Sequence, residues 1–288
     1  MTRYFTDKLA KYAAFISGFT AIIILLLIAL FIFREGLPAF AEVGVFDFIF
    51  GSTWRPGIDQ YGILAMIVGS IAVTVVSMIM AVPLGIACAI LLAEVAPLKV
   101  RNILRPAVEL LVGIPSVVYG LVGLVLLVPI IENIGGSGFS ILTASIVLMV
   151  MVLPTIISIS EDSIRAVPAS YREGALALGA TKWQTIKGVV LPAAKSGIGA
   201  AIVLGMGRAI GETMAMIMVI GNSIAFPHSL LDAARTLTGN IALEINYATG
   251  IHESALFATG VVLFIFILLL NSAATIFLKR GSNAQHLR

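Results

Sequence analysis

The amino-acid sequence predicts an all-α membrane protein with six transmembrane helices. Hydrophobic residues make up 59% of the 288 residues and charged residues only 11%, whereas soluble domains contain about 25% charged residues. Long apolar stretches recur along the chain, and positive charges gather in alternate connections between them. The chain has too few polar residues to cover the core of a soluble fold of this length.

Six stretches reach the roughly 20 apolar residues that a helix needs to cross a hydrocarbon core of about 30 Å. They cover residues 13–33, 62–93, 108–131, 139–160, 193–221 and 255–278. The second and fifth exceed a straight crossing, so we expect them to tilt or to extend beyond the bilayer. The first follows basic residues, as the apolar region of a signal peptide does, but it is too long for one, and we expect a permanent anchor.

The distribution of Lys and Arg predicts which connections face the cytoplasm. Fourteen of these 18 residues lie in the N-terminal segment, the second and fourth connections and the C-terminal segment, and three lie in the other connections. Because positively charged connections stay on the cytoplasmic side, both termini and the fourth connection are predicted to be cytoplasmic. The connections over residues 34–61 and 222–254 are then external, where they either receive a soluble partner or are simply solvated.

The fourth connection carries the signature of two short helices joined by a turn. Ser170 with Glu173 has the spacing of one capping box. Thr181 with Gln184 has the spacing of a second. Gly179, between them, can adopt the left-handed conformation that ends a helix. The predicted hairpin offers these apolar side chains to a partner: Leu176, Leu178, Trp183 and Ile186.

The fifth stretch contains a charged pair, Arg208 and Glu212, which a continuous helix would place one turn apart. A charge at the bilayer centre costs roughly 2.5–3.5 kcal/mol, and an exposed pair at this spacing returns only a few tenths of a kcal/mol. We therefore expect both groups to face a hydrated pathway, where Arg208 offers planar donors to an oxyanion and Glu212 holds the guanidinium. The alternative is an ion pair that fixes helix register or acts as a gate without binding a ligand.

Small residues in the same stretch predict close helix packing in two rows. The first row contains Gly197, Ala201, Gly205 and Ala209, and the second contains Gly207, Gly211 and Ala215. In the third stretch, Gly113 and Pro115 can break the helix and expose Ser116 and Tyr119 to the pathway. A simple proline kink is the alternative, and an ion pair with Arg105 accounts for Glu109.

No catalytic, metal or nucleic-acid site is predicted. The chain lacks H-E-x-x-H, G-x-S-x-G and clustered aspartates in a span, and it lacks the G-x-x-x-x-G-K-[ST] loop that binds ATP. Its external acidic and histidine residues have no tight ligand spacing. The net charge of +3 reflects the basic residues of the connections that are predicted to be cytoplasmic. The single cysteine, Cys88, cannot form a disulfide within the chain.

The spacing of five residues in the hairpin segment resembles the EAA loop of ATP-binding-cassette importer permeases, in which the loop docks on a cytoplasmic ATPase. These residues are Glu173, Ala175, Gly179, Leu191 and Pro192. Gly174 and Val189 depart from the usual Ala and Ile. Together with GIPSVVYG, GRAIGETMA and HESALFATGVVLFIFILLLN, the motif makes the chain from residue 62 onward resemble the C-type permease subunit of phosphate-specific importers.

The resemblance implies an N-terminal anchor and external loop over residues 1–61 and an importer permease domain over residues 62–288. It implies as partners a homologous A-type permease, two copies of a cytoplasmic ATPase and an external phosphate-binding protein, in the lipid of a bacterial inner membrane. A phosphate-sensing kinase is a further partner of such systems. The chain itself is then non-catalytic and has no cofactor, because the ATPase binds ATP and Mg. Trp183 would add to the coupling surface, and Arg208 and Glu212 would line the phosphate path.

Other interpretations stay open. An importer of sulfate, molybdate or phosphonate would have the same features, because much of the selectivity resides in the binding protein. An ion-coupled secondary transporter would work without an ATPase, which leaves the capped hairpin unexplained. A scaffold that relays phosphate status to a sensor kinase would tolerate changes at Arg208 and Glu212.

Overall fold

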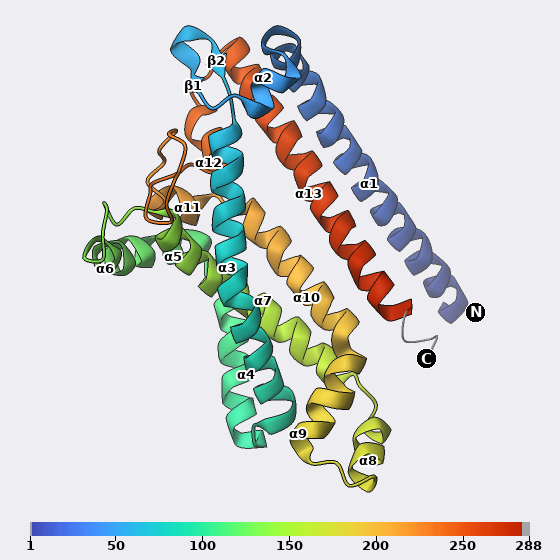
Figure 1. The fold of residues 1–288 in the computed structure, drawn as a ribbon. Helices are drawn as coiled ribbons and strands as arrows, with labels where there is room; N and C mark the ends of the chain where they lie inside the picture. Colours follow the sequence, from blue (N-terminus) through green and yellow to red (C-terminus); the bar gives the residue numbers. More distant parts are fainter. Residues whose placement is uncertain (1, 284–288) are drawn as a thin grey trace.

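The computed structural model describes residues 2–283, with the side chains of residue 8 and residues 10–272. Helices form most of this part of the chain (Figure 1). The long helices are α1 (Thr2–Val43), α3 (Leu64–Ile90), α4 (Leu98–Val112), α7 (Ile141–Arg165), α10 (Leu191–Gly211) and α13 (Ile251–Asn283). The short helices are α2 (Val45–Phe50), α5 (Ser116–Val122), α6 (Val128–Glu132), α8 (Ala169–Ala177), α9 (Lys182–Thr185), α11 (Met214–Val219) and α12 (Leu237–Glu244). The π-helical turns η2 (Leu91–Val95), η3 (Gly123–Leu127) and η4 (Ile186–Val190) adjoin them, and the strands β1 (Trp54–Arg55) and β2 (Gln60–Tyr61) pair antiparallel around the 3-10 turn η1 (Pro56–Ile58).

Within the described residues, five helices are long and apolar enough to span a membrane, and the bent pair of α4 with α5–α6 makes a sixth when it is counted as one span. They follow the six predicted stretches in order. The third stretch is broken by 98° between Val112 and Ser116, where the sequence predicted a break. The predicted limits of the fifth stretch are wrong, because the helix runs without interruption from Lys182 to Gly211 and stops there.

The helices α3, α7 and α10 pack together as the centre of the bundle (Figure 1). Their buried side chains form one apolar core with those of α11, including Leu148, Ile156 and Met216. The helices α5 and α6 lie across the bundle near its mid-height, and α5 packs against α11. On another side, α1 packs along α13, where the rings of Phe31 and Phe257 meet edge to face. The short helices α5 and α11, which carry or adjoin predicted site residues, thus lie beside the central helices.

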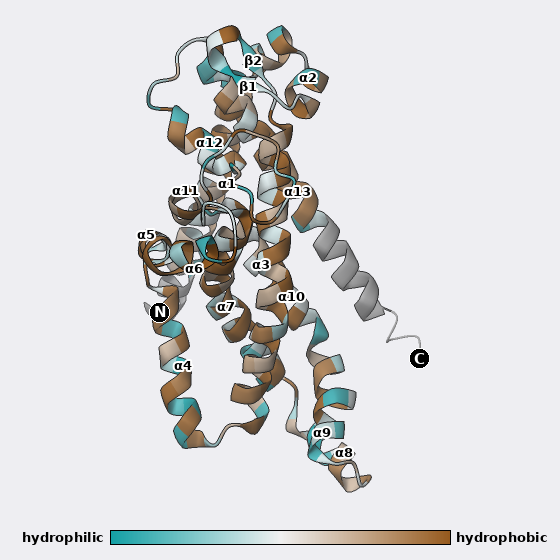
Figure 2. Ribbon diagram, turned by 60° about the vertical axis from the view of Figure 1, so that its left-hand side comes forward, coloured by the Kyte–Doolittle hydropathy of each residue, from teal (hydrophilic) through white to brown (hydrophobic). Residues whose placement is uncertain are grey.

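The two ends of the bundle are built differently (Figures 1 and 2). The end with α8, α9 and the start of α4, here called the hairpin end, has polar residues concentrated on short helices. The opposite end, here called the loop end, holds α2, the β1–β2 hairpin and α12. The second and fourth connections, which carry many of the positive charges, meet at the hairpin end.

Candidate functional site

The fifth span ends inside the bundle, within the sequence GRAIGETMA. α10 stops at Gly211, and Glu212 has an extended backbone with φ −68° and ψ 132°. The short helix α11 follows from Met214, and the Glu212 carbonyl accepts a hydrogen bond from Thr238 Oγ1 at 3.0 Å. Irregular backbone at membrane depth is tolerated where it is buried in protein or lines a cavity. The break therefore lies between α10 and α11, next to Arg208 and at Glu212.

The predicted pair between Arg208 and Glu212 is not formed. Arg208 Nη1 donates to Thr155 Oγ1 of α7 at 3.3 Å. Glu212 Oε1 instead accepts the backbone N–H of Ala215 at 3.1 Å. Because the helix ends before Glu212, the carboxylate is not on the Arg208 face, and it satisfies an N–H that the first turn of α11 leaves unpaired. No ion pair joins the two side chains in the described part of the chain.

The break in the third span lies next to this region through the packing of α5 against α11. The Tyr119 hydroxyl donates to the Leu111 carbonyl at 2.8 Å, so it reaches back across the break to the end of α4. The Arg208 guanidinium is close enough to interact electrostatically with the Tyr119 phenol. Ser116 is the first residue of α5, and within the described residues no side-chain hydrogen bond connects it to Arg208 or Glu212. Tyr119 thus lies toward Arg208, and Ser116 begins the same short helix.

Small residues on α10 allow close contact with α7. A Cβ placed on Gly197 would lie 2.2 Å from Ser163 Oγ, and one placed on Gly205 would lie 2.9 Å from Ile156 Cγ1. Ala201 and Ala209, in the same row, are buried. Gly211 differs, because nothing lies within 4 Å of a Cβ placed there. Gly211 therefore does not pack against another helix within the described part of the chain, and its packing role stays a prediction.

The hairpin between α7 and α10 contains the coupling motif. The second predicted capping box is confirmed, since Thr181 and Gln184 exchange side-chain hydrogen bonds with each other's backbone N–H. The first is wrong: α8 begins at Ala169, directly after Pro168, and has no side-chain cap. Ser170 is the second residue of this helix, so it does not occupy the N-cap position that a capping box requires. Gly179 has φ +83° and forms the left-handed turn that was predicted.

Three of the four predicted apolar side chains of the hairpin are exposed. Leu178 is 91% exposed, Trp183 is 61% exposed and Leu176 is also exposed. Ile186 is buried, which corrects the prediction that it faces a partner. Glu173 and Ala175 lie on α8, whereas Leu191 and Pro192 form the first turn of α10 beyond η4. The motif therefore covers both the exposed hairpin and the base of the fifth span.

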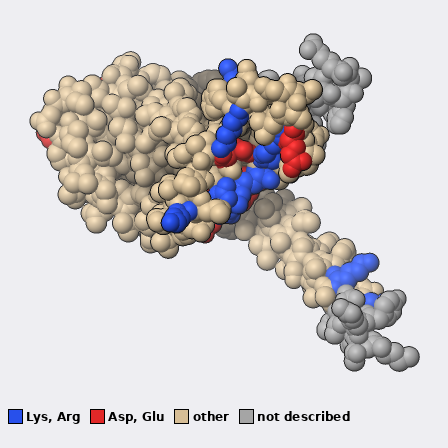
Figure 3. Space-filling model, turned by 90° about the horizontal axis from the view of Figure 1, so that it is seen from below, with Lys and Arg blue, Asp and Glu red and all other residues tan. Residues whose placement is uncertain are grey.

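Charged residues cluster beside the hairpin (Figure 3). The predicted pair of Arg105 and Glu109 is confirmed at 3.1 Å. Arg105 also contacts Asp162 at 3.1 Å and the buried Glu161, which is bonded to Arg165 as well. The sequence predictions missed Glu161, although its i, i+4 spacing to Arg165 was a visible signal. They also missed the ion pair between Arg172 and Glu94, which lie 78 residues apart and gave no such signal.

At the loop end, the carboxylate of Glu244 joins the connections over residues 34–61 and 222–254. It accepts hydrogen bonds from Trp54 Nε1 at 2.9 Å and from Arg235 Nη1, and it lies 2.8 Å from His252 Nε2. Trp54 comes from the connection over residues 34–61, and the other groups come from the connection over residues 222–254. Glu244 and His252, two of the residues considered as metal ligands, are thus bonded to other side chains of the loop end.

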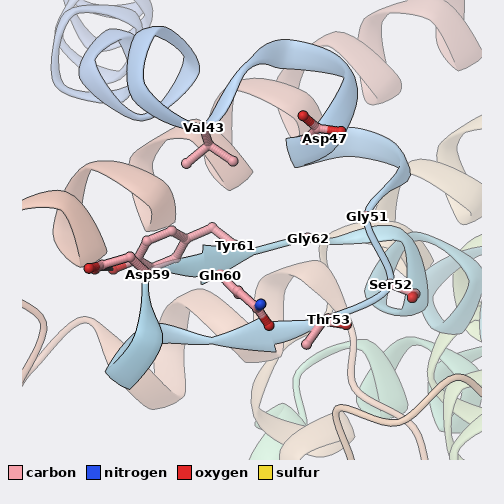
Figure 4. A pocket seen from close by; sticks show the side chains of 9 residues that line it. All are labelled: Val43, Asp47, Gly51, Ser52, Thr53, Asp59, Gln60, Tyr61 and Gly62. Atoms are coloured by element: carbon pink, nitrogen blue, oxygen red, sulfur yellow. Dashed lines mark hydrogen bonds between the residues drawn. The ribbon is translucent and has the colours of Figure 1, made fainter.

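A cavity of about 240 Å³ also opens at the loop end, between α2 and the β1–β2 hairpin (Figure 4). Asp47 lies on one side of it, and Tyr61 and Asp59 lie on another. The Tyr61 hydroxyl donates to Asp59 at 3.2 Å. Burial and the neighbouring Asp59 carboxylate raise the pKa of Tyr61 to about 12, so the phenol stays neutral.

The geometry defines a class: a polytopic helical membrane protein with two interrupted spans, a charged break within the bundle and an exposed helical hairpin at one end. Residues 81–282 match the family described as "Binding-protein-dependent transport system inner membrane component". The chain belongs to this family, and it is therefore a membrane permease component of a transport system.

Relatives with similar sequences cover most of the chain. It is 47% identical over 255 residues to the probable ABC transporter permease protein YqgH of Bacillus subtilis, covering 84% of this chain and 82% of the relative. It is 36% identical over 256 residues to the phosphate transport system permease protein PstC of Pasteurella multocida, covering 82% and 80%. A chain of the MetNI methionine ABC transporter in inward-facing conformations superposes with a TM-score of 0.61 at 22% identity, covering 80% of this chain and 99% of that chain. The fold is that of an ABC importer permease.

Proposed function

We propose that the chain is the transmembrane permease subunit of an ATP-driven importer of inorganic phosphate. The observation that carries the proposal is the placement of Arg208 in the last turn of α10, beside the break in the fifth span. One of its N–H groups is bonded to Thr155, and the others have no partner among the described residues. A guanidinium offers planar, permanently charged donors that suit an oxyanion. The relatives named as phosphate transport permeases support phosphate as that anion.

The surfaces of the molecule suit the partners of such an importer. The exposed apolar side chains of the hairpin, led by Leu178 and Trp183, offer a contact for a cytoplasmic ATPase. The segment of α5, η3 and α6 exposes apolar side chains that suit a homologous A-type permease, among them Leu121, Val125 and Ile130. The loop end offers its surface to an external phosphate-binding protein, and a phosphate-sensing kinase is a further candidate partner.

In this assembly the chain binds and releases phosphate without catalysing a reaction. Two ATPase copies bind ATP and Mg, and the chain has no cofactor of its own. Movement of the hairpin during hydrolysis shifts the continuous helix from Lys182 to Gly211, at whose far end Arg208 lies. Arg208 donates to the phosphate oxygens, and the negative charge of Glu212 limits how tightly the anion is held.

The proposed location is a bacterial inner membrane, with both termini and the hairpin in the cytoplasm. Single cysteines test the orientation, in a background in which Cys88 is replaced by serine. In right-side-out vesicles, an impermeant thiol reagent is expected to label Ser52→Cys, in the first external connection, and to spare Ser170→Cys. The reverse pattern would contradict the orientation.

The function is tested by uptake of labelled phosphate into vesicles that contain the reconstituted complex, with and without internal ATP. We expect ATP-dependent uptake that excess sulfate or molybdate does not reduce. Inhibition by either anion would indicate another oxyanion substrate. Uptake without ATP would indicate a secondary transporter, and an assembled complex that takes up no phosphate would contradict the proposal.

A further inference from the structure

The two helices of the hairpin are attached to the bundle in different ways. α9 continues through η4 into α10 as one helix from Lys182 to Gly211. α8 has no buried residue, and its main packing neighbours are α9 and η4. Apolar packing therefore does little to connect α8 with the other spans.

The side chain of Arg172 supplies a polar connection. Its Nε donates to Glu94 Oε1 at 2.9 Å, and its Nη2 also contacts this oxygen. Nη1 donates to the Val167 carbonyl at 2.6 Å, and Nη2 donates to the Ile164 carbonyl at 2.9 Å. One guanidinium on α8 therefore holds both the end of α7 and the segment that contains Glu94.

Glu94 lies in η2, the π-helical turn that ends the second span after α3. Its side chain is only 10% exposed, and that of Arg172 is 24% exposed. The same turn is held from α4, because Arg101 donates to the Leu92 and Ala93 carbonyls at 2.8 and 3.1 Å. π-helical turns occur frequently at functional sites. A pull on Glu94 would therefore act on a turn whose carbonyls are fixed to the neighbouring helix.

We infer that the Arg172–Glu94 ion pair transmits movement of the hairpin to the second span, while the continuous helix transmits it to the fifth. Arg172 is then a positioning residue for coupling, and this role rests on the proposed importer function. The planar guanidinium suits it, because its fixed fork can bond a carboxylate and two carbonyls at once, which a lysine ammonium cannot do in the same geometry. By contrast, Arg105 and Glu109 both lie on α4, so the ion pair between them does not join α4 to another span.

The test uses the complete complex in vesicles and measures phosphate uptake and ATP hydrolysis in the same preparation. Glu94→Gln keeps the shape of the side chain and removes its charge. We expect it to lower the phosphate taken up per ATP about tenfold, a typical size for coupling between two sites, while hydrolysis continues. Arg172→Lys should lower the ratio by a smaller factor. Glu109→Gln is the matched control and should leave it unchanged.

A cross-link provides the rescue. In the Cys88→Ser background, Glu94→Cys with Arg172→Cys should be uncoupled, and a short bifunctional thiol reagent should restore the ratio. A normal ratio in Glu94→Gln, equal loss of uptake and hydrolysis, or failure of an efficient cross-link to restore coupling would overturn the inference. If wild-type complex hydrolyses ATP but takes up no phosphate, the proposed substrate is wrong. The ion pair is then judged by whether Glu94→Gln abolishes stimulation of hydrolysis by the external binding protein.

Discussion

The positions of Arg208 and Glu212 depend on where one helix ends. Their spacing predicts an intrahelical pair, yet Glu212 lies beyond α10 and caps α11 instead. The break contains no proline, and glycine at position 211 is a weak signal inside an apolar stretch. The sequence therefore predicted which residues are charged and intramembrane, but it could not predict their bonding partners.

Arg208→Ala is expected to abolish phosphate uptake while the complex still assembles. The substitution removes a charged donor, and hydrogen bonds to charged groups contribute about 1.5–3 kcal/mol each, so uptake should fall at least about tenfold. Arg208→Lys should retain part of it. Labelled-phosphate uptake checks this, with Thr155→Val as a control that removes only the hydrogen bond that Arg208 donates to α7. Near-normal uptake in Arg208→Ala would contradict a role in the pathway.

Glu212→Ala is expected to destabilise the complex by about 0.5–2 kcal/mol, the cost of losing a cap at a helix start. Glu212→Gln should be less destabilising, because its amide oxygen can still accept the Ala215 N–H. Thermal unfolding of the purified complex compares the two variants. Equal stability of both would mean that the cap contributes nothing.

At the scale of elements, the hairpin was well predicted and its first helix start was not. Gly179 and the Thr181 box are local signals, and both are found in the structure. Ser170 also matched a box, but Pro168 starts the helix earlier and leaves Ser170 within it. Because the N-cap position falls on Pro168 and not on Ser170, the serine side chain cannot form the predicted capping box.

Gly179→Val is expected to uncouple ATP hydrolysis from uptake. Nothing lies within 4 Å of a Cβ placed at this residue, so the effect comes from backbone strain at φ +83° and not from a clash. A left-handed conformation costs roughly 1–2 kcal/mol for an ordinary residue. Gly179→Asn is the control, because asparagine tolerates this conformation. Coupled transport in the valine variant would contradict the prediction.

Gly197→Ala is expected to destabilise the packing of α10 on α7 by about 1–3 kcal/mol, the usual cost of overpacking. The new Cβ would fall 2.2 Å from Ser163 Oγ and 2.5 Å from its Cβ. Gly207→Ala on the same helix is the control, since its nearest neighbour, Asn271 Oδ1, is 3.9 Å away. Thermal unfolding of the two variants should differ clearly, and equal midpoints would refute the close contact.

At the scale of the whole molecule, composition predicted the number of candidate spans, whereas the side of each connection stays a prediction from the charge distribution. The long-range bonds that tie these parts together were beyond such reasoning. Trp54 and Glu244 are 190 residues apart, and Arg172 and Glu94 are 78 apart. A carboxylate in a loop looks the same in sequence whether it is solvated or buried against an arginine, because only the fold determines its neighbours.

Glu244→Leu is expected to destabilise the whole loop end. Arg235, which is largely buried, would lose its charged partner, and breaking a buried pair on one side costs about 3–5 kcal/mol. Trp54→Phe removes a single hydrogen bond to the carboxylate and should cost less. Limited proteolysis of residues 222–254 and thermal unfolding check this order. Similar behaviour of the two variants would contradict a central role for Glu244.

The pairing of α1 with α13 has a consequence for the synthesis of the chain. These helices lie far apart in sequence but side by side in the fold. The apolar part of α1 is exposed on nearly all sides, so lipid can surround it while it is alone. The ribosome makes α13 last of all the spans described here. During translation, α1 therefore enters the bilayer long before its main packing neighbour exists, and it joins the bundle only when the final span has been inserted.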